Sequence, residues 1–225
     1  MRPQVATTET LTNDANGIFE DQTTGGAAAL TLNGALVSSG IAYAHGVANT
    51  TAQAQKVSIE GTGNNAAFTA TIIGTDAGGA AQTEVLTLAN NGTATTTAYF
   101  RTVSSITVDG NIDGNIEGGF LSAQGAALRE FYLDRQQLPG NTSLTAALSS
   151  GGAATFTAQY SVTVRDPQST TSYAGSAVWQ SVDGLAAVTA TTSSNLAYDA
   201  VAVRLIVTTY TSGTITFTAI QGNPY

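Results

Sequence analysis

The stretch FTAQYSVTVR, residues 156–165, alternates apolar or small side chains with polar ones at every second position. Successive side chains of a β-strand point to opposite faces of the sheet, so this period predicts a long strand. One face of the strand would be wet and the other buried. The residues expected on the buried face are Phe156, Ala158, Tyr160, Val162 and Val164.

The C-terminal part of the chain repeats this pattern. Val201, Val203, Leu205 and Val207 alternate with Ala202, Arg204, Ile206 and Thr208, and Ile215, Phe217 and Ala219 share one face of the last strand. The intervening segment, Tyr210–Gly213, reads as a turn. The two runs together predict a hairpin over Ala200–Gln221.

The first half of the chain also reads as short strands separated by turns. Asp76–Gly79 and Asn90-Asn91-Gly92 carry turn residues. Regular strand–turn spacing is typical of a sandwich or barrel, and no helical period of four or more turns occurs. The expected strands are Ala29–Val37, interrupted at Asn33-Gly34, then Ala54–Ile59, Phe68–Ile73, Gln82–Leu88 and Arg101–Val108.

The predicted fold class is all-β, with two β-sandwich or jelly-roll-like domains and a polar N-terminal arm. Residues 1–26 show few strand signals and form the expected arm. A shift toward Gly, Asn, Asp and Glu near 109–125 places the domain boundary there, which gives domains at 27–120 and 121–225. Ala126–Arg135 is interpreted as a short helix or a final strand.

Composition excludes several functional classes. The 225 residues include 10% charged residues and carry a formal net charge of −8. The seven Lys and Arg residues are scattered, so no basic cluster is available for nucleic-acid phosphates. No apolar run reaches the length of a membrane helix, and no secretory leader is recognisable at the N-terminus. The absence of cysteine excludes disulfides and thiolate metal sites.

One segment contains weak candidates for metal ligands. Asp109, Asp113 and Glu117 recur every four residues in a Gly- and Asn-rich stretch. Calcium prefers such oxygen-rich loops, but the ligands of an EF-hand alternate every second residue. A solvated acidic linker is the favoured interpretation, so neither a metal nor a cofactor is expected.

Catalytic residues are not expected either. His45, the only histidine, lies in a segment whose residues indicate a loop, and the sequence contains no G-x-S-x-G motif. Carboxylate pairs for glycoside hydrolysis meet in space, so sequence leaves that alternative open. Trp179 is interpreted as a core residue. The tyrosines expected near turns, where they could rim an interface, are Tyr43, Tyr99, Tyr173, Tyr198 and Tyr210.

Several motifs resemble a recurring stretch of tailed-bacteriophage virion proteins. In the first half they are QKVSI (55–59), FTATIIGTD (68–76), TEVLTL (83–88) and TTTAYFRTVSSITVD (95–109). In the second half they are TAQYSV (157–162), Trp179, AVRL (202–205) and IQ (220–221). The resemblance covers residues 28–225. Its motifs are packing and turn patterns, so it transfers no catalytic residue.

The resemblance implies a non-enzymatic virion structural protein, assembled in the bacterial host cytoplasm. The leading hypothesis is a capsid decoration or cement protein that binds the major capsid protein and forms a homotrimer. The alternatives are a tail or head-to-tail component and a host-receptor or glycan-binding module. No nucleic acid or membrane is expected as a partner.

The alternation also predicts the core. The residues expected to be buried are Val57, Ile59, Phe68, Ile72, Phe100, Val103, Ile106, Phe156, Tyr160, Val162, Val203, Leu205 and Phe217.

Overall fold

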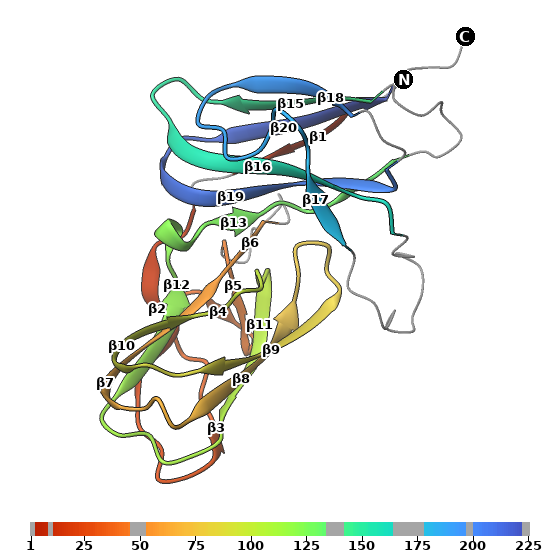
Figure 1. Ribbon diagram of the computed structural model, residues 1–225. Helices are drawn as coiled ribbons and strands as arrows, with labels where there is room; N and C mark the ends of the chain where they lie inside the picture. The colour runs from red at the N-terminus through yellow and green to blue at the C-terminus, as the bar shows by residue number, and fades with distance from the viewer. Residues whose placement is uncertain are drawn as a thin grey trace. The chain divides into compact units, whose positions relative to one another are not determined.

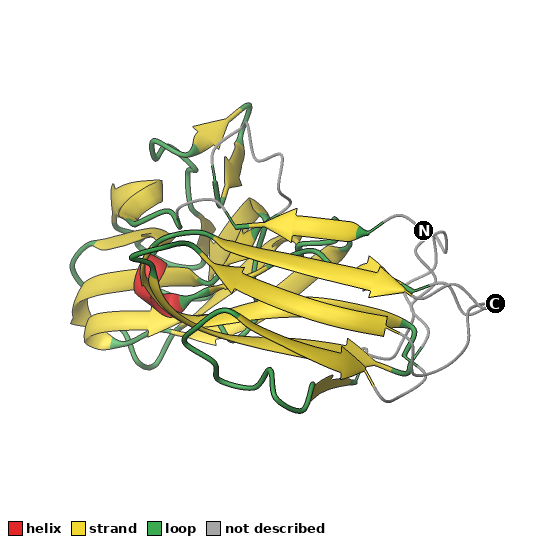
Figure 2. Cartoon of the chain, turned by 90° about the horizontal axis from the view of Figure 1, so that it is seen from above, coloured by secondary structure: helices red, strands yellow, loops and turns green. Residues whose placement is uncertain are grey.

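The computed structural model describes residues 3–8, 11–45, 53–133, 142–163, 178–196 and 200–221. Strands dominate these residues, and the only helical element among them is the single 3₁₀ turn η1, Ser122–Gln124 (Figures 1 and 2). The prediction of an all-β fold is therefore confirmed.

The chain divides into two compact units. The first unit is Thr10–Ala127, and the second combines Leu128–Tyr225 with Met1–Glu9. The division differs from the predicted domains at 27–120 and 121–225, because residues before position 27 belong to both units.

Two sheets build the first unit. One has the strand order β10-β7-β12-β2, and the other has the order β4-β5-β11-β8-β9, with β3 also paired to β11. The short strands β6 and β13 pair with each other. The bounds are β2 Asp14–Gln22, β3 Ala28–Ala29, β4 Val37–Ser38, β5 Ile41–Tyr43, β6 Ala54–Gln55, β7 Val57–Asn64, β8 Thr69–Thr75, β9 Ala81–Thr87, β10 Asn90–Thr95, β11 Thr102–Val108, β12 Ile116–Phe120 and β13 Ala126–Ala127.

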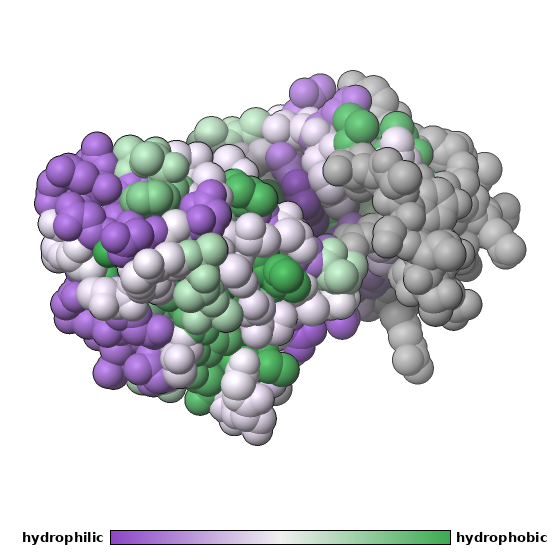
Figure 3. Space-filling view, turned by 90° about the horizontal axis from the view of Figure 1, so that it is seen from below, coloured by the Kyte–Doolittle hydropathy of each residue, from purple (hydrophilic) through white to green (hydrophobic). Residues whose placement is uncertain are grey.

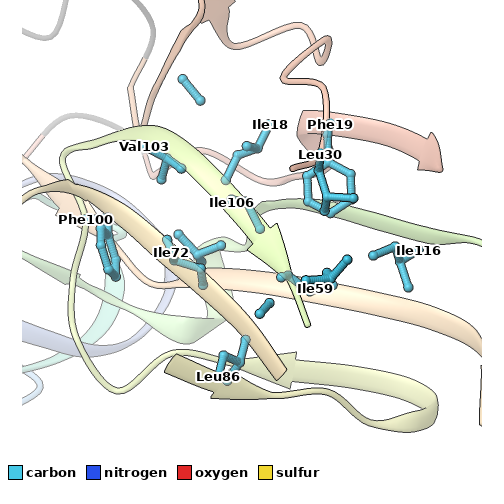
Figure 4. Close-up of a cluster of buried hydrophobic side chains, with 14 of the residues drawn as sticks. Ile18, Phe19, Leu30, Ile59, Ile72, Leu86, Phe100, Val103, Ile106 and Ile116 are labelled. Carbon is cyan, nitrogen blue, oxygen red and sulfur yellow. The ribbon is translucent and has the colours of Figure 1, made fainter. Parts of the chain in front are cut away.

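The inward-facing side chains of both sheets form one hydrophobic core (Figure 4). It includes Ile59 from β7, Ile72 from β8 and Ile106 from β11, each almost fully buried. Period-two alternation placed these residues correctly, since each strand turns every second side chain toward the opposite sheet. Phe68 is only partly buried and packs against the edge of the cluster.

The second unit is also built from two sheets. One has the order β1-β20-β15-β18, and in the other β16 lies between β17 and β19 while β14 pairs with β19. Phe131 of β14 and Phe217 of β20 stack across the sheets, with ring centroids 5.8 Å apart. The bounds are β1 Gln4–Thr7, β14 Phe131–Tyr132, β15 Thr142–Leu148, β16 Ala153–Ser161, β17 Trp179–Ser181, β18 Thr192–Leu196, β19 Ala202–Ser212 and β20 Ile215–Gln221.

The hairpin predicted over Ala200–Gln221 is wrong. Strands β19 and β20 follow each other, but β19 pairs with β16 whereas β20 pairs with β15 and β1. The chain crosses between sheets at Gly213, whose φ of 95° suits glycine. Alternation specifies which side chains face the core, and it does not specify the partner strand.

The predicted N-terminal arm is also wrong, because residues 1–26 contribute strands to both units. Strand β1 pairs with β20, next to which it lies in Figure 1, and β2 pairs with β12. Ile18 and Phe19 of β2 are fully buried. Two consecutive apolar residues among polar ones give little period-two signal, which explains the error.

The Gly-rich stretch 109–119 is not a linker. Strand β12 lies between β7 and β2, and Ile112 and Ile116 are buried. A Cβ atom on Gly118 would collide with the Phe19 ring. These glycines therefore permit close packing, although their composition resembles that of a flexible segment.

Other local expectations need correction. Asn90 to Gly92 lies within β10 as an irregularity of pairing, with Asn91 at a φ of 44°. Val162 is 52% exposed, because β16 ends at Ser161. The strand expected over Ala29–Val37 is reduced to β3 and β4, and Ala126–Arg135 forms β13 and β14 up to the last described residue, 133.

The first prediction tests the strand that opened the sequence analysis. Phe156 is fully buried, so Phe156→Ala should lower the free energy of unfolding by about 3–5 kcal/mol. Thr157 lies on the other face and accepts a hydrogen bond from the Ala187 N–H (2.9 Å). Thr157→Ala should cost about 0.5–1.5 kcal/mol. Urea unfolding of both variants measures the difference, and equal losses would contradict the assigned faces.

The second prediction tests the place of β2 in the core. Phe19→Ala should lower the free energy of unfolding by about 3–5 kcal/mol, because the ring is fully buried against the Gly118 backbone. The adjacent Glu20 side chain is exposed, so Glu20→Ala should change stability by less than about 0.5 kcal/mol. Thermal or urea unfolding provides the measurement. If Phe19→Ala left the free energy of unfolding unchanged, the interpretation of residues 1–26 as an arm would be restored.

Candidate interaction surfaces

Two of the three weak metal candidates, Asp109 and Asp113, make separate hydrogen bonds within the fold. Asp109 accepts hydrogen bonds from the backbone N–H and hydroxyl of Thr69, both at 2.7 Å. Asp113 accepts one from the Asn64 N–H at 3.0 Å. Among the described residues, no group of three or more His, Cys, Asp or Glu side chains is placed to hold a metal ion.

The other candidates are also distributed over the fold. His45 is half-buried just after β5. Tyr210 is buried and its hydroxyl donates to the Gly213 carbonyl at 2.8 Å, so it does not rim an interface. Tyr43 and Tyr99 are half-buried, and Lys56 Nζ lies 5.4 Å from the Tyr99 ring centroid. Tyr173 and Tyr198 lie outside the described residues.

Trp179 does not belong to the core, contrary to expectation. It is half-buried at the start of β17, and the Arg204 guanidinium stacks 4.1 Å from its ring centroid. Gln159 lies on β16, between β17 and β19, and it accepts a hydrogen bond from Arg204 Nε at 2.9 Å. A tryptophan held by an arginine in this way presents a preformed aromatic surface for stacking.

A row of carboxylates crosses the sheet that contains β12. Glu117 stands directly opposite Glu60 of β7, and β2 supplies Asp21 and Asp14 nearby. Partial burial raises the pKa of Glu117, and the charges of Asp21, Glu60 and Asp14 raise it further. Like charges directly opposite each other destabilise a sheet, so this row reduces the stability of the first unit at neutral pH.

The outer face of the sheet β1-β20-β15-β18 carries no charged side chain among the described residues. Core-facing residues such as Phe217 and Leu144 alternate with outward ones, and the outward residues are short. Val5 and Ile220 are the exposed apolar members, at 51% and 41%. The outward residues are Val5, Thr7, Thr216, Thr218, Ile220, Ser143, Thr145, Ala147, Ser193 and Asn195. We call this surface the threonine face.

A similar surface covers the outer side of β11-β8-β9 in the first unit. Thr71, Thr107 and Val85 form one row across these strands, and Ile73, Ser105 and Thr83 form the next. Asp109 lies at one end, where its carboxylate is bonded to Thr69. Figure 3 shows one side of the chain, on which pale residues of intermediate hydropathy separate small green and purple groups.

Uncharged, short side chains suit a contact surface. Charged residues are depleted from the centres of protein interfaces, because their desolvation is costly. Threonine presents a methyl group and a hydroxyl that can both donate and accept hydrogen bonds. The sequence did contain this signal, since the polar members of its alternating strands are mostly Thr and Ser and seldom charged.

Comparison with known proteins identified no relative. No family model, no curated protein and no solved structure matches the chain. Within the described residues, no helix is long and apolar enough to cross a membrane.

The third prediction concerns the pH dependence of stability. The folded-state pKa of Glu117 is raised, so its charge opposes folding at neutral pH, and stability increases as pH falls through this pKa. Glu117→Gln should therefore stabilise the protein at neutral pH, by about 0.2–1 kcal/mol for a cross-strand pair. This advantage should shrink as pH falls and Glu117 becomes protonated.

Asp109 provides the matched control, with the opposite sign. The Thr69 N–H and hydroxyl lower its pKa, so its contribution is present at neutral pH and is lost as pH falls through the lowered pKa. Asp109→Asn should destabilise the protein at neutral pH. Thermal unfolding between pH 3 and pH 8, in the range where carboxyl groups titrate, measures both variants. Shifts of the same sign would contradict these roles.

Proposed function

We propose that this chain is a non-enzymatic structural protein of a tailed-bacteriophage virion, a decoration or cement protein that binds the major capsid protein. The observation that carries the proposal is the uncharged threonine face of the sheet β1-β20-β15-β18. A capsid presents a repeated surface, so a decoration protein needs a flat contact region with a low desolvation cost.

The distribution of charge supports a binding role for this face. The chain carries a net charge of −8, yet four adjacent strands expose only Thr, Ser, Asn, Ala, Val and Ile on one side. Acidic side chains elsewhere favour solubility. The resemblance to phage virion proteins supports the virion as the location.

A host-receptor or glycan-binding module on a tail is the second candidate. It is favoured by the half-exposed Trp179, which Arg204 holds from β19. Sugars stack on exposed aromatic rings, so such a module would act through Trp179 and would leave the threonine face unused. A decoration protein would instead occur in many copies over the head, whereas a tail component would occur at the tail or the neck.

The fourth prediction tests this proposal on particles. Antibody-labelled virions should carry label over the whole head, and purified protein should rebind heads that lack it. Thr218→Lys places a charge in the middle of the threonine face and should weaken rebinding by at least about tenfold, equivalent to about 1.4 kcal/mol. Trp179→Ala should leave rebinding unchanged.

Thr107→Lys is the matched control, because Thr107 is an exposed threonine on the outer face of β11, in the other unit. It should bind heads as the unmodified protein does. Label confined to the tail, or loss of cell or glycan binding in Trp179→Ala alone, would overturn the decoration role in favour of the second candidate.

A further inference from the structure

Strand β9 is the edge strand of its sheet. It pairs with β8 over seven residues, from Ala81 opposite Thr75 to Thr87 opposite Thr69, without a shift in register. Among the described residues of the first unit, no strand pairs with its other side. An edge strand presents a row of backbone N–H and C=O groups to any chain that can pair with it.

Edge strands usually carry features that prevent pairing with other chains, and β9 has few of them. Strand β9 contains no proline, lysine or bulge, and its outward side chains are all uncharged. These outward residues are Ala81, Thr83, Val85 and Thr87, each exposed. Val85 is 61% exposed, and Ile73, its diagonal neighbour on β8, is 43% exposed.

The one charged residue of β9, Glu84, is turned inward and is already compensated. Its carboxylate accepts hydrogen bonds from the Thr97 N–H (2.8 Å), the Thr97 hydroxyl (2.9 Å) and the Ala98 N–H (2.9 Å). Gln82 also points inward, and its Nε2 donates to the Tyr99 carbonyl at 2.7 Å. A strand added to this edge would therefore leave the Glu84 charge with its present partners.

We infer that two copies of this chain pair through β9, antiparallel about a two-fold axis, which joins their sheets. A second copy is the best-matched occupant, because an edge strand that meets its own copy antiparallel satisfies both rows of backbone groups. Charge also favours it. The chain as a whole carries −8, so copies approach most easily where the outward side chains are uncharged. Pairing also covers part of Val85.

This inference goes beyond the proposed function and does not depend on it, since pairing is a property of the purified protein. A two-fold contact produces a dimer, whereas the resemblance implies a trimer. The mass in solution therefore distinguishes the dimer from the trimer. A failure to bind capsids would count against the decoration role and would leave the dimer unaffected.

Sedimentation of the purified protein over the micromolar range should detect a dimer of the 22.7 kDa chain. Thr83→Lys and Val85→Lys would each bring two like charges together at the edge, and should weaken the dimer by at least about tenfold. Thr107→Lys, on the same outer face but in the central strand β11, should leave it intact. Circular dichroism of each variant verifies that it is folded.

Cross-linking locates the contact. The chain has no cysteine, so Ala81→Cys, Thr83→Cys, Val85→Cys and Thr87→Cys each introduce a single thiol. Disulfides need Cα atoms about 4.4–6.8 Å apart, so oxidation should link copies most efficiently at the position nearest the two-fold axis. Thr107→Cys should not cross-link. A monomer throughout the range, a trimer that the lysine variants do not change, or equal cross-linking at Thr107→Cys would overturn the inference.

Discussion

The packing of the Phe19 ring against the bare backbone of Gly118 is the contact on which the first unit depends. A side chain at Gly118 would collide with the ring, and one at Gly119 would collide with the backbone of Asp14 and Ala15. Two adjacent glycines in β12 therefore let β2 lie close beside it. The fully buried Phe19 then joins the core that both sheets of the first unit share (Figure 4).

This contact also shows what sequence reasoning could and could not find. Alternation correctly predicted the all-β class and the buried faces of β8, β11 and β16, because side-chain direction is a local property of a strand. It failed for β1 and β2, whose burial is decided by distant partners. It also misread the glycines of β12, since the same residue type serves flexible linkers and close packing.

The candidate surfaces were only partly accessible from sequence, for similar reasons. The Thr-rich character of the outward faces could be read from the alternation, but the assembly of Val5, Thr218, Thr145 and Ser193 into one row needed the pairing of four strands. Spacing along the chain grouped Asp109, Asp113 and Glu117, whereas pairing places Glu117 with Glu60 instead. Charge is therefore concentrated on one sheet of the first unit and absent from the threonine face of the second.

The pairing of β1 with β20 has a consequence for synthesis of the chain. Gln4 lies opposite Ala219, so β1 is synthesised long before the strand with which it pairs. At about 5–20 residues per second, β1 waits roughly 10–45 s for that partner. The first unit is a continuous segment, Thr10–Ala127, and can fold during this interval. Strand β1 then remains unpaired until β20 has been made, so the order of translation favours completion of the second unit after the first.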